Sequence, residues 1–144
     1  MINIKELSIG NYLRVAKEGL FIKKGTIIKI NGIDSEDKFM EKGLVGLISC
    51  HPLDKYQFDG GIWLAYLEPI EITPEILEKS GWKININDIN PMKWFAYLDE
   101  KAVIVKNSDL VTVITDRGMK TPFKYVHQLQ NILTLCGIDK EIKL

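Results

Sequence analysis

Three short runs rich in β-branched and aromatic residues dominate the second half of the chain. They cover residues 94–98, 102–105 and 110–114, and the segments that join them, 99–101 and 107–109, consist of polar residues common in turns. Short runs of this composition, separated by such segments, are typical of neighbouring antiparallel strands. The sequence therefore predicts an antiparallel three-stranded meander in this half.

A short helix ahead of the meander is marked at both of its ends. Thr73 is placed to cap it, Pro74 suits the first helical position, and Glu75 faces the positive end of the helix dipole. Lys79 falls in the last turn, and Gly81 follows as the stop signal. A helix this short has to dock against other elements to be stable. The asparagine-rich residues 82–90 that follow it predict a loop with some extended structure.

A second helix is expected after the meander, over residues 122–136, with Thr121 and Pro122 as its opening and Gly137 as its end. Residues 125–136 contain no formally charged side chain, although average composition would place about three in such a stretch. A helix without charges is expected to pack or to make contacts. Its apolar stripe consists of Val126, Leu129, Leu133 and Cys136. Residues 138–144 follow as a short tail and a candidate edge strand.

Polar residues recur beside this stripe at helical spacing, namely His127, Gln130, Asn131 and Thr134. One interpretation is that they hydrogen-bond the sheet edge or water. The other is that they form a partner-binding face, because uncharged amides avoid the desolvation cost of burying ions. Burial of these residues would favour the first interpretation, and exposure the second.

Trp82 is a further interface candidate. It directly follows the stop of the first helix, and a tryptophan in such a loop is often an exposed anchor. Filling of the core is the alternative role for this residue, as it is for Trp63 and Trp94.

The first half of the chain is expected to be β-rich. Short strands are predicted over residues 12–16, 26–30, 43–50, 56–58 and 62–66. Their number and spacing favour either a small SH3-like barrel or a bent antiparallel sheet. With residues 67–71 as a hinge, the overall prediction is an α+β protein in which residues 1–70 form the SH3-like β subdomain and residues 71–144 an α+β subdomain; one compact domain is the alternative.

Charge argues against a dedicated polyanion-binding protein. The chain carries 19 basic and 19 acidic residues, and only two of the basic residues are arginines, the side chain preferred for phosphate and base recognition. The nucleic-acid candidates are Lys23 and Lys24 in the first half and Arg117 and Lys120 in the second. Solvated loop charge is the competing explanation for all four.

No catalytic or cofactor motif is present. His51, His127, Cys50 and Cys136 are the only histidines and cysteines. Nine residues of helix separate His127 from Cys136 and turn them to opposite sides, so the four side chains do not suit a zinc site. Glycines 43 and 46 lack the third glycine and the following helix of a nucleotide-binding loop. We therefore expect no metal, no cofactor and no enzymatic activity.

The N-terminal residues are charged within the first turn, and no long apolar run follows them. No signal peptide and no membrane contact are expected, which makes the cytoplasm the default compartment. Two cysteines suit that compartment as small buried hydrophobes.

Three blocks of the chain resemble a family of small bacterial proteins associated with prophages and other mobile elements. The first block is ELSIGNY at residues 6–12, and the second is LEPI at 67–70 with TPEIL at 73–77 and GW at 81–82. The third is YVHQLQN at 125–131 with Gly137. The chain departs from the family pattern at Ser8, where arginine is usual, and at Pro74, where an acidic residue is usual. The resemblance implies a cytoplasmic accessory protein that works by binding and carries over no catalytic residue.

The resulting hypothesis is a protein-binding module that uses the face of the C-terminal helix, either with another protein or in self-association. The alternative is a nucleic-acid-binding accessory protein of a mobile element.

Overall fold

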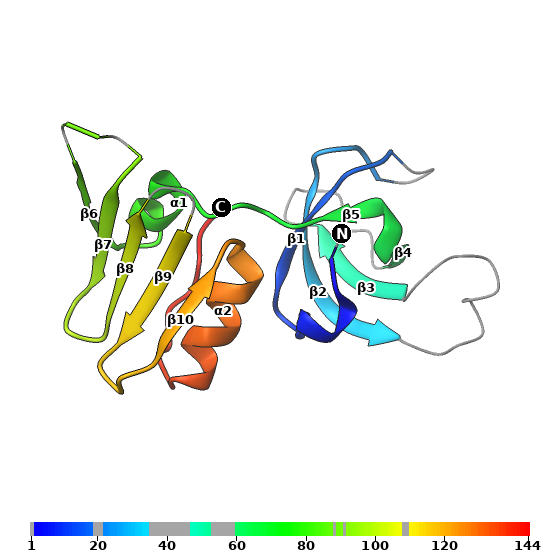
Figure 1. Ribbon diagram of the computed structural model, residues 1–144. Coiled ribbons are helices and arrows are strands. Elements are labelled where there is room, and N and C mark those ends of the chain that lie inside the picture. The colour runs from blue at the N-terminus through cyan, green and yellow to red at the C-terminus, as the bar shows by residue number, and fades with distance from the viewer. Residues whose placement is uncertain are drawn as a thin grey trace. The chain divides into compact units, whose positions relative to one another are not determined.

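The protein is mixed α+β, which confirms the predicted class. The computed structural model describes residues 2–18, 22–34, 47–52, 60–87, 89–90, 92–107 and 110–144. The chain folds into two compact units, Met1–Ile70 and Glu71–Leu144 (Figure 1). Each unit is described by itself below.

The first unit is built on an antiparallel five-stranded sheet whose strands follow the order β4-β3-β2-β1-β5. The strands are β1 (Tyr12–Val15), β2 (Ile27–Asp34), β3 (Leu47–Pro52), β4 (Gly60–Trp63) and β5 (Leu67–Glu68), with 3-10 turns at Ile4–Glu6 and Leu64–Tyr66. Among the described strands, β4 and β5 lie at the two edges and do not pair with each other. Of the two predicted architectures, the bent antiparallel sheet is therefore the observed one, and the closed barrel is not.

Strand β2 is longer than the sequence predicts. Asn31 and Gly32 favour an end to the strand after Ile30, but pairing with β3 continues to Asp34 across a register shift between Ile30 and Gly32. A bulge of this kind absorbs one residue and lets the strand go on. The predicted strand at 56–58 lies outside the described residues, as does the beginning of the one predicted at 43–50.

Gly10 and Asn11 shape the turn that leads into β1. Gly10 has a positive φ of 92°, a conformation that favours glycine, and its N–H donates to the carbonyl of Ile30 at 2.7 Å. The buried side chain of Asn11 accepts a hydrogen bond from the N–H of Ser8 at 2.8 Å. This turn places β1 against β2 over a core that includes Leu13, Val15 and Ile28.

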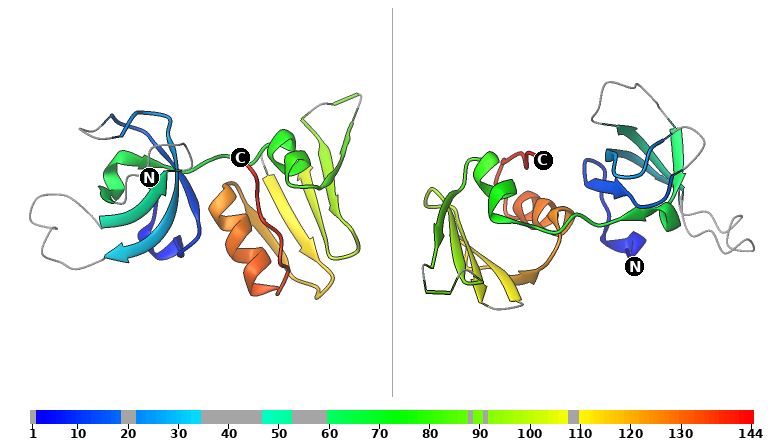
Figure 2. Two further views of the ribbon diagram at one scale, coloured as in Figure 1. Left: turned by 180° about the vertical axis from the view of Figure 1, so that it is seen from behind. Right: turned by 90° about the horizontal axis from the view of Figure 1, so that it is seen from above.

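The second unit contains a five-stranded antiparallel meander in the order β10-β9-β8-β7-β6. Its elements are α1 (Pro74–Lys79), β6 (Lys83–Ile86), β7 (Trp94–Leu98), β8 (Ala102–Asn107), β9 (Leu110–Thr115), β10 (Lys120–Phe123) and α2 (Val126–Leu135). Figure 2 shows both helices on the same, concave face of this sheet. The three predicted strands are the central ones of the five.

Helix α1 has the predicted ends. Thr73 precedes it in extended conformation, and its Oγ1 accepts a hydrogen bond from the N–H of Ile76 at 3.4 Å. Gly81, at a φ of 82°, follows the helix, and the N–H of Trp82 returns to the carbonyl of Leu77 at 3.0 Å. These bonds satisfy main-chain groups that a helix end leaves open.

The ends of the meander differ from the prediction. Residues 83–86, expected in a loop, form β6, and Thr121 and Pro122, expected to open the second helix, lie in β10. The helix begins only at Val126. Residues 138–144, a candidate edge strand, form no strand; Ile138 and Ile142 are buried nonetheless.

Candidate interaction surfaces

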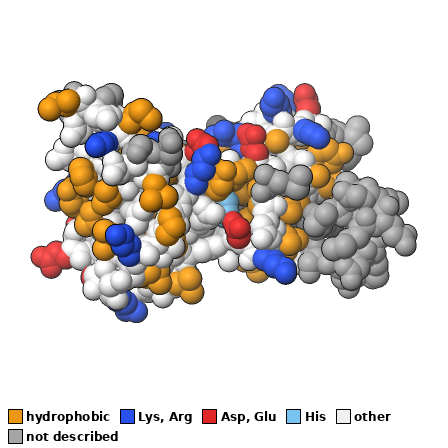
Figure 3. Space-filling model, viewed as in Figure 1, with side chains coloured by type: hydrophobic (Ala, Val, Ile, Leu, Met, Phe, Trp, Pro, Cys, Tyr) orange, Lys and Arg blue, Asp and Glu red, His pale blue; other side chains and the backbone are white. Residues whose placement is uncertain are grey.

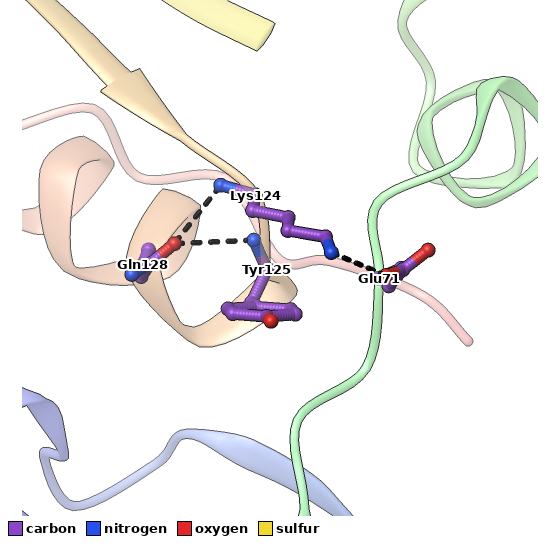
Figure 4. A network of polar contacts seen from close by, with 4 residues as sticks. All are labelled: Glu71, Lys124, Tyr125 and Gln128. Carbon is purple, nitrogen blue, oxygen red and sulfur yellow. Dashed lines mark hydrogen bonds and ion pairs between the residues drawn. The ribbon is translucent and has the colours of Figure 1, made fainter. Parts of the chain in front are cut away.

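The start of α2 is held by the side chain of Gln128. Its Oε1 accepts hydrogen bonds from the N–H of Lys124 at 2.9 Å and from that of Tyr125 at 3.2 Å (Figure 4). A glutamine at the third helical position commonly reaches back in this way. Gln128 therefore fixes where α2 begins, which assigns part of the uncharged C-terminal stretch a structural role.

The same network joins α2 to the beginning of the second unit. Lys124 Nζ lies 2.9 Å from Glu71 Oε1, and the N–H of Ile72 donates to the carbonyl of Lys124 at 3.1 Å. The Glu71 carboxylate raises the pKa of Lys124. The ion pair is thus present at neutral pH, and on the alkaline side it is lost as the pH rises through the raised pKa of Lys124. Both side chains are largely exposed, so the pair adds little to stability.

Replacing Gln128 by alanine is expected to lower the free energy of unfolding by about 1 kcal/mol, because two main-chain donors lose their acceptor. Urea denaturation followed by circular dichroism measures the change. Gln128→Glu is the matched control, since its carboxylate keeps an acceptor in place and suits the positive helix end. Equal stability of the alanine variant and the parent would contradict the capping role.

His127 is buried, with 1% of its surface exposed. Its ring stacks on that of Tyr125, with centroids 5.7 Å apart and an interplanar angle of 10°. A side chain in this position is not available to a partner. For His127, the interface interpretation is therefore not supported.

The other three polar residues of the predicted stripe lie nearer the surface. Gln130 and Asn131 are half-buried and Thr134 is exposed. Thr134 Oγ1 donates to the carbonyl of Gln130 at 2.9 Å, within the helix itself. The largest exposed side chain of α2 is Leu135, at 77%, which the sequence did not single out. The predicted stripe thus changes from buried to exposed along its length.

Trp82 is a core residue in this structure, with 2% of its surface exposed. It follows the turn at Gly81 and precedes β6, and the neighbouring Leu77 is also buried. A loop position did not imply exposure here, because α1 packs against β6 and β7 around this segment. Trp82 is therefore not an exposed anchor.

The four basic candidates belong to different units. Lys23 and Lys24 are exposed at the turn before β2, and Arg117 and Lys120 are exposed around the turn between β9 and β10. The Arg117 guanidinium lies beside Gly137, 3.6 Å from the position that a Cβ atom on this glycine would take. Gly137 follows the C-terminal end of α2, where a positive charge is favourable. All four are thus surface residues, two in each unit.

The described residues contain no cluster of three or more histidine, cysteine, aspartate or glutamate side chains fit to hold a metal ion. Cys136 is buried, with its Sγ 3.8 Å from Thr115 Oγ1 and 3.7 Å from Met119 Sδ. Cys50 and His51 lie next to each other in β3, paired with Ile30 and Lys29. Their side chains lie outside the described part.

An open depression of about 880 Å³ lies at one end of the second unit's sheet. It is lined by Tyr97 and by five charged residues, Lys83, Asp99, Glu100, Lys101 and Asp116. All five charged side chains are exposed. Substrate pockets are usually enclosed and largely apolar, with a few convergent polar groups, and this depression lacks that character.

The convex face of the second unit's sheet carries apolar side chains without a cover among the described residues. Strand pairing aligns Tyr97, Val103 and Ile114 in one row and Phe95, Val105 and Thr112 in the next. We call these six residues, with Pro122 beside Thr112, the outer face. Phe95, Tyr97 and Ile114 are exposed to 37%, 38% and 39%. Figure 3 shows hydrophobic side chains at the surface over these strands, with basic side chains (lysine or arginine) between them.

A sheet with one face in water normally alternates apolar inward and polar outward residues. Strand β7 alternates in burial, with Trp94, Ala96 and Leu98 inside, but its outward residues are aromatic. Strand β8 likewise turns Val103 and Val105 outward. Apolar residues at these four outward positions of β7 and β8 were the available signal in the sequence. The high strand propensity of the same residues masks this signal.

Comparisons with family models, curated proteins and solved structures found no match. In the described part of the chain, neither helix has the length and apolar character needed to cross a bilayer.

Proposed function

We propose that the protein is a non-enzymatic accessory protein that binds another protein through the outer face. The observation that carries this proposal is the exposure of Phe95, Tyr97 and Ile114 together on one uncovered sheet face. Aromatic side chains are enriched and charged side chains depleted at the centres of protein interfaces. The resemblance to accessory proteins of mobile elements agrees with a role in binding.

The arrangement of charge favours a protein partner. Lys83 and Lys120 flank the row of Tyr97, Val103 and Ile114 at the two sheet edges. Asp99 and Asp116 lie at the end of the same face, around the open depression. An apolar centre with both signs of charge at its rim matches protein interfaces more closely than polyanion-binding surfaces.

The experiment compares three tagged proteins in capture from host-cell extracts: the parent, Phe95→Ser/Tyr97→Ser, and Asn131→Ala/Thr134→Ala on α2. A captured protein is then purified and titrated by calorimetry. We expect the outer-face variant to bind at least about tenfold more weakly, because it removes two aromatic anchors. The α2 variant should retain its affinity.

Circular dichroism and urea denaturation establish that the serine variant is folded. Loss of binding in the α2 variant alone would overturn the outer face as the site and restore the predicted helix face. Equal affinity of all three proteins would exclude both surfaces.

Single-stranded nucleic acid is the second candidate, for one specific reason. The strands β6 to β10 contain no aspartate or glutamate, and Lys83 and Lys120 lie in register with Tyr97 and Ile114 of the outer face. Bases stack on exposed aromatic side chains while lysines contact phosphates. Binding of a short labelled oligonucleotide would support this candidate if the affinity falls steeply with salt concentration and is also lower in Lys83→Ala/Lys120→Ala. Absence of binding at low salt would remove it.

A further inference from the structure

The main chain of β6 presents free hydrogen-bonding groups at an edge of the second unit's sheet. Asn87 N–H donates to the carbonyl of Lys93 at 3.0 Å, and the same register pairs Asn85 with Phe95 and Lys83 with Tyr97. In an antiparallel ladder, alternate residues bond to the neighbouring strand. The N–H and C=O of Ile84 and Ile86 therefore point away from β7, and they have no partner among the described residues.

The opposite edge of the sheet is protected. Thr115 N–H donates to the carbonyl of Met119 at 3.0 Å. In β10 the residues whose main-chain groups point away from β9 are therefore Lys120 and Pro122. Proline has no N–H to offer, and lysine and proline at an edge discourage pairing with another chain. Strand β6 has no proline and carries only Lys83 as a charge. The two edges thus differ in their capacity to accept another strand.

We propose that β6 pairs antiparallel with β6 of a second copy of this chain, about a twofold axis at Asn85, and joins two sheets into one. In this register Ile84 lies opposite Ile86 of the second copy, and Ile86 opposite its Ile84. Both residues direct their main-chain groups outward, so the pairing forms four hydrogen bonds. A shift that places Ile84 opposite itself would bring Ile86 opposite Trp82, whose N–H already donates to Leu77.

The side chains around the axis suit this self-pairing. Asn85 would face its own copy, where two amides can hydrogen-bond, and Lys83 would face Asn87, so no like charges meet. Ile86, exposed to 48%, would lie beside Ile84 of the second copy and lose contact with water. The joined sheet would place the outer faces of the two copies on one surface. The proposed pairing is independent of the function proposed for the outer face.

Sedimentation equilibrium of the full chain tests the proposal, over about 5 µM to about 500 µM. The mass of the parent should rise from 16.5 kDa toward twice that value. Asn85→Asp places two carboxylates opposite each other and should weaken association about tenfold. Asn107→Asp, the same change at the exposed end of β8, should leave it unchanged.

Ile86→Pro removes two of the four proposed bonds and no bond to β7, and it should also weaken association. A covalent readout fixes the register: Asn85→Cys should form an intermolecular disulfide under mild oxidation, whereas Asn107→Cys should give no more dimer than the parent. A mass that stays at 16.5 kDa throughout would overturn the proposal. So would association that neither Asn85→Asp nor Ile86→Pro weakens, or crosslinking that is equal at both cysteine positions.

Discussion

Trp82→Ala is expected to destabilise the second unit by about 3–5 kcal/mol, the usual cost of removing a buried tryptophan side chain. The residue is 2% exposed and connects α1 to β6, so its loss leaves a cavity beneath a helix too short to hold itself together. Hydrogen exchange of peptides from residues 71–144 measures the effect. Their protection should fall by several orders of magnitude.

Trp82→Phe is the matched control for this substitution. It keeps most of the apolar volume and removes an indole Nε1 that has no hydrogen-bond acceptor among the described residues. We expect less than half of the destabilisation seen with alanine. If Trp82→Ala were as stable as the parent but lost affinity for a captured protein, the core role would be wrong and the predicted anchor role right.

The two helix openings show why identical signals had different outcomes. Thr73 and Pro74 open α1 as predicted, because the main chain at Thr73 is extended and its hydroxyl accepts from Ile76. Thr121 and Pro122 lie in β10, where Pro122 pairs with Thr112. At this position a main-chain N–H would point away from β9, so proline costs no hydrogen bond to that strand. An edge strand tolerates proline at such a position. The choice depends on pairing with β9, which no local signal reports.

Local signals also fell short at strand ends. The asparagine-rich residues 82–90 predict a loop with some extended structure, yet residues 83–86 pair with Trp94–Tyr97 of β7. Tertiary pairing here outweighs the weak strand preference of asparagine. The central strands of the meander could be predicted because β-branched and aromatic residues fill both faces. The same property concealed the outer face, since a propensity argument does not distinguish a strand with two apolar faces from one with a binding face.

The predicted polar stripe illustrates the limit for the site. Spacing correctly places His127, Gln130, Asn131 and Thr134 on one helix, but only His127 is fully buried and only Thr134 is exposed. Helical periodicity gives relative directions within a helix. It does not say how deeply the helix sits in its sheet, which depends on the volumes of residues far away in the sequence. Burial therefore had to come from the structure.

Leu129→Ala is expected to cost about 2–5 kcal/mol of unfolding free energy, the range for a leucine removed from a packed core. Leu129 is fully buried and lies in the middle of α2, the longer of the two helices of the second unit. Because α2 covers the concave face of the sheet (Figure 2), the cavity would open between these two layers. Urea denaturation and hydrogen exchange in residues 71–144 measure the loss.

Leu135→Ala provides the matched control, since it makes the same change on the same helix at a side chain that is 77% exposed. Its stability should stay within about 0.5 kcal/mol of the parent. Alanine has the higher helix propensity of the two residues, so no loss is expected from the helix itself. Equal costs at the two positions would mean that α2 is not docked through Leu129. A large cost at Leu135 alone would mean that α2 packs through its opposite side. The assignment of the outer face, which places α2 on the concave side of the sheet, would then be wrong.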